Sequence, residues 1–246
     1  MHESKQPTLL SDYRPSNFKI TNVTLLFQLD PNSTKVTSKL SVRALKKNTN
    51  LVLDGQDLHL KYLKINGKKI NKNELIINND KMLVPKHLIP WEHFSVETHV
   101  IINPKNNFSL EGLYISSGIF CTQCEAEGFR KITYFIDRPD ILATYNVRIE
   151  GEYANLLSNG NLIKYGKNFA EWFDPWPKPS YLFALVAGNM KSLDDVFITK
   201  SKRKVNLKIF AKPGNTGKCA YAMKALKKAM RWDEEVYRRE YDLNLF

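Results

Sequence analysis

The five histidines are the residues that could hold a catalytic metal ion, and their spacing decides whether they do. Zinc sites of the common helical type take two histidines at positions i and i+4, which lie on one face of a helix. Here no two histidines are four residues apart, and no His-Glu-x-x-His occurs. The spacing therefore excludes a self-contained helical zinc-peptidase site within this sequence. The histidines are His2, His59, His87, His93 and His99.

Two cysteines form a C-x-x-C motif, Cys121-Thr122-Gln123-Cys124, which suits a redox pair or half of a zinc knuckle. A knuckle needs a second pair of ligands, and the only other thiol is that of Cys219. A redox pair is expected at a helix N-terminus, where the thiol pKa falls, but the flanking residues predict a strand and a loop. The nearby Glu125 and Glu127 would raise a thiol pKa instead. A redox function is therefore the weaker alternative.

The net charge of +12 is the strongest compositional signal, and it is compatible with a nucleic-acid or membrane partner. However, 28 of the 37 basic residues are lysines, and they are scattered from Lys5 to Lys228. A nucleic-acid groove clusters its basic residues and places aromatic side chains among them. The pattern therefore favours a composition bias over nucleic-acid binding, and it leaves weak peripheral contact with an acidic membrane surface open.

No apolar run reaches the roughly 20 residues needed to cross a bilayer. The most apolar stretch, 181–187, has the length of a buried strand. The first residues lack the basic and apolar regions of a secretory signal. These features predict a cytoplasmic protein. We leave open that it makes peripheral contact with the cytoplasmic face of the inner membrane.

Most of the first 190 residues predict β-strands. In 23–29, 36–44 and 94–102, apolar and polar residues alternate as in half-buried strands. Asn66-Gly67 predicts a tight hairpin because both residues tolerate a positive φ. Many short strands with frequent turns favour an antiparallel β-sandwich. Further strands are predicted at 129–136, 143–150, 161–173 and 180–187.

The pattern changes near residue 194, which predicts a sandwich domain over 1–193 and the start of an incomplete α/β domain over 194–246. A strand around 205–209 is followed by the breaker Pro213-Gly214-Asn215 and by an amphipathic helix over 215–239. Residues 241–246 predict the opening of another strand. We expect this second part to have no core of its own and the sequence to stop inside a domain.

Several collinear segments carry the most specific signal in the sequence. They are Leu110-Glu111-Gly112-Leu113-Tyr114, 121–130, 134–140, 157–161, Asp174-Pro175-Trp176-Pro177-Lys178-Pro179, 181–188 and Met230-Arg231-Trp232-Asp233-Glu234-Glu235. Because the segments occur together and in order, they are far more specific than any single motif. They resemble the bacterial branch of the aminopeptidase N family of thermolysin-like zinc metallopeptidases, and the resemblance runs from about Tyr13 to Phe246.

The resemblance implies that a β-sandwich lies over a zinc-dependent catalytic domain and contributes one loop to its active site. By match, that loop contains Gln123, which would line the pocket for the first side chain of a peptide, and Glu125, which would hold its free α-amine. A carboxylate suits this role because it forms a charge-assisted hydrogen bond with a terminal ammonium. The alternative is that Glu125 forms an ordinary surface ion pair with Arg130 or Arg138.

The family's Gly-x-Met-Glu-Asn and His-Glu-x-x-His motifs have no counterpart in the sequence. We therefore predict that this chain is the N-terminal part of an aminopeptidase N, a fragment or truncated remnant that binds no zinc and is inactive alone. Full-length relatives would bind zinc and act on peptides. Two alternatives remain open, namely a non-catalytic peptide- or surface-binding sandwich and a C-x-x-C redox protein.

Overall fold

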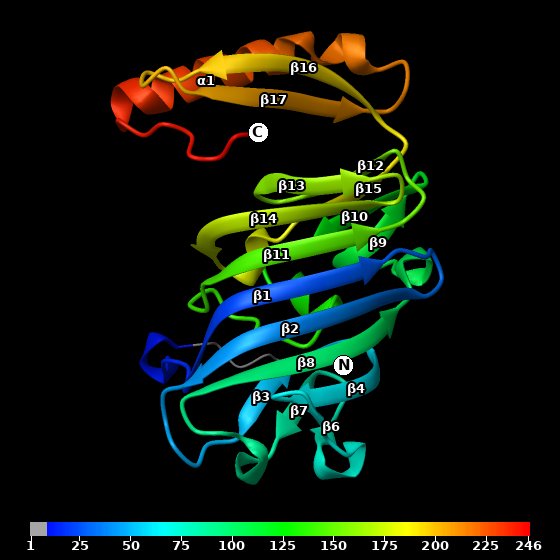
Figure 1. Ribbon diagram of the computed structural model, residues 1–246, viewed down its shortest axis with the longest axis vertical. Helices are drawn as coiled ribbons and strands as arrows, with labels where there is room; N and C mark the ends of the chain where they lie inside the picture. The colour runs from blue at the N-terminus through cyan, green and yellow to red at the C-terminus, as the bar shows by residue number, and fades with distance from the viewer. Residues whose placement is uncertain (1–8) are drawn as a thin grey trace.

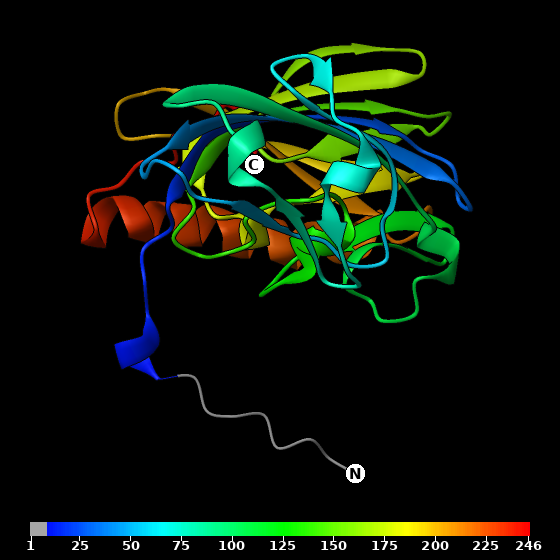
Figure 2. The same ribbon diagram turned by 90° about the horizontal axis from the view of Figure 1, so that it is seen from below.

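The computed structural model describes residues 9–246, in which a large sheet packs against smaller sheets. The large sheet has eight strands in the order β13-β14-β11-β1-β2-β8-β4-β5. Figure 1 shows it in front of the smaller sheets, and Figure 2 shows the same layers from below. Its strands are β1 (Phe18–Gln28), β2 (Thr34–Ala44), β4 (His59–Ile65), β5 (Lys68–Lys69), β8 (His93–Ile102), β11 (Ala143–Glu150), β13 (Asn161–Gly166) and β14 (Phe169–Lys178).

The alternation of apolar and polar residues places one face of the large sheet in the core and the other in solvent. In β2, for example, Val36, Leu40 and Val42 are buried, whereas Lys35 and Lys39 are exposed. The neighbouring strands pair antiparallel, except that β1 and β11 run parallel. The predicted mainly β sandwich is confirmed, with this one parallel pair inside an otherwise antiparallel sheet.

Two smaller sheets cover the inner face of the large one, and a single apolar cluster includes side chains from all three sheets. Aromatic rings form its centre, where Phe129 packs edge-on against Phe135, Tyr145 and Phe183. One sheet contains β12 (Asn155–Ser158), β15 (Leu185–Gly188), β10 (Ile119–Gln123) and β9 (Gly112–Ser116). The other contains β3 (Leu51–Asp54), β7 (Lys81–Val84) and β6 (Ile76–Ile77).

The predicted strand over 129–136 is wrong. Residues 128–131 form the short 3-10 helix η5 (Gly128–Lys131), and Phe135 makes only an isolated bridge with Asp54. The segment crosses the interior between the sheets, so its apolar residues are buried without belonging to a strand ladder. A run of buried residues has no periodicity that separates these two cases.

The other predicted strands of the sandwich are confirmed with changes at their ends. The strand over 143–150 is β11, and the hairpin at Asn66-Gly67 joins β4 and β5 with positive φ at both residues. The segment 161–173 is two strands, β13 and β14, and 180–187 begins as a 3-10 helix before β15. The remaining 3-10 helices are η1 (Leu10–Asp12), η2 (Lys72–Glu74), η3 (Lys86–Leu88), η4 (Pro104–Asn106), η6 (Ser180–Leu182) and η7 (Thr216–Cys219).

After the sandwich, β16 (Lys191–Ile198) and β17 (Lys204–Ala211) form a hairpin covered by α1 (Ala220–Val236). The predicted helix is confirmed, preceded by η7. The buried Glu234 on α1 accepts a hydrogen bond from the Lys200 backbone N–H at 2.9 Å, which ties the helix to the turn of the hairpin. The expectation that this part lacks a core is wrong, because α1 and the hairpin enclose a small apolar cluster. The cluster contains Phe197, Val205, Leu207, Met223 and Met230.

The last residues pair with β17, as the predicted strand opening requires. Leu245 forms a parallel bridge with Asn206, and the Phe246 backbone N–H donates to the Asn206 carbonyl at 2.9 Å. Among residues 9–246, the structure contains no helix whose length and apolar character would let it cross a membrane.

A chain ending at residue 193 is expected to fold and to be more soluble than the parent. The main core lies within residues 18–187, so the truncation removes little of it. It also removes α1 and the residue after it, where Tyr221, Trp232, Val236 and Tyr237 are exposed and would promote self-association. Circular dichroism and sedimentation velocity of both chains test this. Stronger aggregation of the shorter chain would show that the division near residue 194 is wrong.

Candidate functional site

The β9–β10 hairpin positions both residues that the sequence singled out. Ser117 and Gly118 have positive φ at its turn, which joins the antiparallel strands tightly. At the opposite end of the hairpin, Gln123 is the last residue of β10 and pairs with Gly112. The loop 124–127 follows and carries Glu125, whose peptide bond to Ala126 is cis. The hairpin thus brings Gln123 and Glu125 to one short surface loop.

Gly128 closes this loop tightly. Its backbone N–H donates to the Cys124 carbonyl at 2.9 Å. A Cβ atom at this position would lie 2.3 Å from the Gln123 carbonyl oxygen and 2.9 Å from the Gly112 nitrogen. Since real Cβ atoms do not approach backbone so closely, only glycine lets the loop return under β10.

A buried ion pair fixes the loop from below. The Arg130 Nε atom lies 3.0 Å from Oδ2 of Asp137, and the Arg130 Nη1 atom lies 3.3 Å from the Glu127 carboxylate on the loop. The Asp137 side chain is 1% exposed, and its Oδ1 atom accepts a hydrogen bond from the Ser180 hydroxyl at 2.5 Å. The Asp137 backbone N–H donates to Asp54 at 3.0 Å. Arg130 therefore connects the loop to a polar network that is embedded in the core.

Gln123 and Glu125 are both exposed at the tip of this loop. The Gln123 Nε2 atom donates to the Glu125 backbone carbonyl at 3.2 Å, which orients one residue relative to the other. Across residues 9–246, the Glu125 carboxylate has no cationic side chain within ion-pairing distance. The alternative surface pair is contradicted, because Arg130 pairs with Glu127 and Asp137, and Arg138 pairs with Asp140.

The cysteines lie in an environment that disfavours thiolate chemistry. Cys121 is on β10 and Cys124 is buried in the loop, and both are free thiols. Burial raises the pKa of the Cys121 thiol. Burial and the Asp137 carboxylate raise the pKa of Cys124 far above its ordinary value. A redox pair needs a lowered thiol pKa, so the structure opposes the redox alternative.

No three His, Cys, Asp or Glu side chains gather as possible metal ligands in the described part of the chain. His59, His93 and His99 lie on β4 and β8, while His87 lies in η3, and His2 is outside the described residues. The Nδ1 atom of His99 is 2.8 Å from the Thr37 hydroxyl, and its ring stacks on Tyr62. The described residues therefore do not fit a zinc ion.

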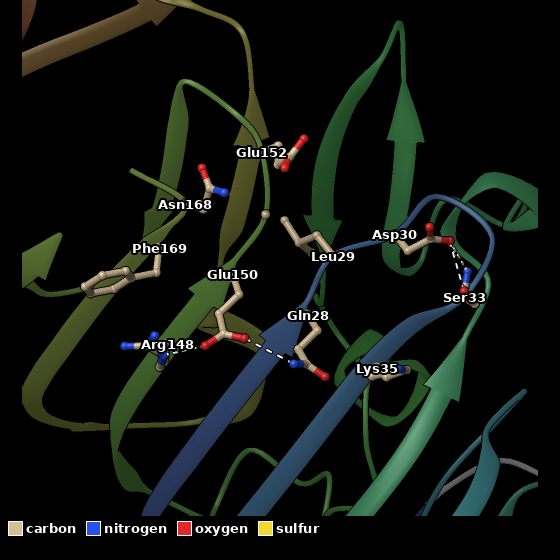
Figure 3. Close-up of a pocket in the computed structure, with 11 residues that line it drawn as sticks. Gln28, Leu29, Asp30, Ser33, Lys35, Arg148, Glu150, Glu152, Asn168 and Phe169 are labelled. Carbon is tan, nitrogen blue, oxygen red and sulfur yellow. Dashed lines mark hydrogen bonds and ion pairs between the residues drawn. The ribbon is translucent and has the colours of Figure 1, made fainter. Parts of the chain in front are cut away.

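A depression of about 560 Å³ lies at another place, where β1 and β11 end (Figure 3). Some of its charged groups are paired. Glu150 pairs with Arg148 at 2.7 Å and accepts from Gln28 at 3.2 Å, while Asp30 accepts from Ser33. Lys35 and Glu152 also line the depression and have no ion pair within residues 9–246. Neither Gln123 nor Glu125 lines it, so it is separate from the loop that the sequence singled out.

The sequence analysis did not identify the supporting residues Gly128, Asp137 and Ser180. Gly128 and Asp137 lie in the segments that resemble the family, but nothing in the local pattern distinguishes a buried aspartate from a surface one. Ser180 is 43 residues from Asp137, so only the fold reveals their hydrogen bond. The signal that was available was an Arg and an Asp seven residues apart, on either side of a segment that is mainly apolar after Lys131.

The loop and the sandwich that holds it define the N-terminal domain class of M1 peptidases. The Peptidase M1 N-terminal domain matches residues 14–182, and the chain belongs to this family. It is 49% identical over 252 residues to aminopeptidase N of Caulobacter vibrioides and 40% identical over 260 residues to aminopeptidase N of Escherichia coli. These alignments cover 99% and 100% of the chain but only 29% of either relative.

A solved structure gives the same result. The crystal structure of Legionella pneumophila aminopeptidase A in complex with aspartic acid matches with a TM-score of 0.87 and 34% sequence identity. The match covers 96% of this chain and 29% of that one. The resemblance to aminopeptidase N that the sequence motifs indicated is thereby confirmed.

Replacing Asp137 by Asn is expected to destabilise the fold by roughly 3 kcal/mol, because it removes the buried counter-charge of Arg130 and leaves only the exposed Glu127 carboxylate. Urea unfolding measures the change. Asp140→Asn is the matched control, since it breaks a more exposed pair with Arg138 and should cost about 1 kcal/mol or less. Equal effects of the two substitutions would contradict the anchoring role of Asp137.

Cys124 is expected to resist alkylation in the folded protein at pH 8, whereas the partly exposed Cys121 reacts slowly and Cys219 reacts readily. The raised pKa of Cys124 keeps its thiol protonated there, and the thiolate is the reactive form. Iodoacetamide labelling followed by peptide mass spectrometry measures each site, with urea-unfolded protein as the control in which all sites react. A reducible Cys121–Cys124 disulfide that disappears in the double Ser variant would support the redox alternative instead.

Proposed function

We propose that this chain is the N-terminal part of an aminopeptidase N and supplies the loop that recognises the free amine of a peptide substrate. The observation that carries the proposal is that the Glu125 carboxylate is free to bind a cation. Its carboxylate is exposed and has no ion-pair partner among residues 9–246, although the chain carries a net charge of +12. The loop beneath it is fixed to the core through Arg130.

An exopeptidase has to distinguish a terminal ammonium from an internal amide. A carboxylate does so because its charge-assisted hydrogen bonds to a cation are about twice as strong as neutral ones. Gln123, which holds the Glu125 backbone carbonyl, would line the space for the first side chain. A loop with little freedom loses little entropy when the ligand binds, so the anchoring by Asp137 and Gly128 supports recognition.

The catalytic chemistry belongs to the remainder of the enzyme in this proposal. Zinc would supply the activated water that attacks the peptide bond in full-length relatives. The described residues offer no ligand set for it, so no step of the reaction is assigned to them. The proposal also divides the chain into a sandwich over 1–193 and the start of a second domain over 194–246. The two separate apolar clusters support this division. The same proposal places the protein in the cytoplasm, in weak contact with the inner membrane.

A chimera tests the role of Glu125. This chain replaces the matching part of Caulobacter vibrioides aminopeptidase N, with which it shares 49% identity. Glu125→Gln is expected to lower kcat/KM for alanine p-nitroanilide by about 10- to 100-fold, because one hydrogen bond to a charged group is lost. The matched control is Glu111→Gln, which removes a nearby exposed carboxylate paired with Lys131.

Two results would contradict the proposal. One is a Glu125→Gln chimera that cleaves as well as the parent chimera. The other is aminopeptidase turnover by the isolated chain with bound zinc in a 1:1 ratio, measured by elemental analysis, because the chain alone is expected to be inactive.

A further inference from the structure

Three lysines converge on a small pocket that the proposed peptidase function does not use. The pocket has a volume of about 240 Å³ and lies between the loop after β2 and the segment before β8. These loops are at the end of the molecule opposite α1 (Figure 1). Its lining is Ala44, Lys46, Lys47, Asn48, Thr49, Lys86, Ile89, Pro90 and Trp91.

The pocket is uniformly basic. Lys46, Lys47 and Lys86 line it, and no Asp or Glu does, although Glu92 follows directly in the sequence. None of the three lysines has an ion-pair partner within residues 9–246, whereas lysines elsewhere pair with Glu97, Glu111 and Asp195. All three lysines are exposed. Like charges around one pocket repel one another, and a bound anion would reduce that repulsion.

The backbone adds hydrogen-bond donors to the same place. Asn48 has a φ of 52°, so the chain turns sharply between β2 and β3. In the part of the chain that is described, the backbone N–H groups of Lys46, Lys47 and Asn48 have no protein acceptor. Ammonium groups and free backbone N–H groups are the donors that hold phosphate oxygens in proteins.

The other wall is apolar and limits what can bind. Trp91 is 48% exposed, and the Lys47 ammonium lies 5.0 Å from the centre of its ring. With Ile89 and Pro90, the indole provides a surface for the non-polar part of a phosphate ester. Lys47 covers one face of the ring, and the lining contains no second aromatic residue, so the pocket lacks the stacking surface of a single-strand nucleic-acid site.

We propose that Lys46, Lys47, Lys86 and Trp91 form a binding site for a small phosphate-bearing anion. The three ammonium groups neutralise the phosphate, and the Trp91 wall contacts the group that carries it. Two sources share this chemistry, namely a soluble phosphate ester and the headgroup of an anionic lipid. Neither Gln123 nor Glu125 lines this pocket.

The test uses the whole chain, with pyrophosphate as the soluble probe, measured by calorimetry. In parallel, sedimentation measures binding to vesicles of phosphatidylcholine with and without phosphatidylglycerol. The pocket variant is Lys46→Gln/Lys47→Gln/Lys86→Gln. The control, Lys61→Gln/Lys68→Gln/Lys69→Gln, removes the same charge from exposed lysines on and beside the β4–β5 hairpin. Circular dichroism confirms that both variants fold.

The pocket variant is expected to bind pyrophosphate at least about tenfold more weakly, which is the loss expected from one charge-assisted hydrogen bond, while the control stays within about twofold. Loss of vesicle binding in the pocket variant alone assigns the site to lipid headgroups. Pyrophosphate binding without vesicle binding assigns it to soluble phosphate esters. The proposal is overturned if the parent binds neither probe, or if both variants lose binding equally.

Discussion

The ion pair between Arg130 and Asp137 is the interaction on which the candidate site depends. A loop of exposed residues does not hold one conformation by itself, because each fixed residue costs about 1–2 kcal/mol of backbone entropy. Arg130 restrains this loop by joining it, through Glu127, to a carboxylate that is hydrogen-bonded inside the core. The pair is costly to bury, and its hydrogen bonds to Ser180 and to the backbone offset that cost.

This anchoring leaves Glu125 without a partner. Arg130 and Arg138, the cations nearest to it in sequence apart from Lys131, are already engaged with other carboxylates. Lys131 pairs with Glu111. The structure thus separates these neighbouring acids into two groups, since Asp137, Asp140 and Glu111 pair with the local cations, whereas Glu125 has no cationic partner within residues 9–246. Under the proposed function, a terminal amine would therefore bind Glu125 without breaking an existing ion pair.

The sequence was sufficient for the class of fold, whereas the roles of Gln123 and Glu125 are implied by the family resemblance and stay predictions. Alternating patterns located β1, β2, β8 and β11, because a sheet with one solvated face imposes a period of two. The sequence was insufficient for the segment 129–136. Residues 132–136 are all buried and so show no alternation, and the path of the segment through the interior depends on contacts with β3 and η6 that lie far away in sequence. Local sequence patterns also cannot predict the Asp137–Ser180 hydrogen bond or the position of Lys86 beside Lys46 around one pocket, because these partners lie far apart in sequence.

The parallel pairing of β1 with β11 has a consequence for how the protein is made. Asn22 lies beside Thr144, and their side chains are joined across 122 residues of sequence. During synthesis, β1 can form its hairpin with β2 early, yet its other edge stays open until β11 has left the ribosome. Contacts of such long sequence separation close slowly. The nascent chain therefore carries an unprotected strand edge while the 122 residues that separate Asn22 from Thr144 are synthesised, and during this time it is prone to aggregate.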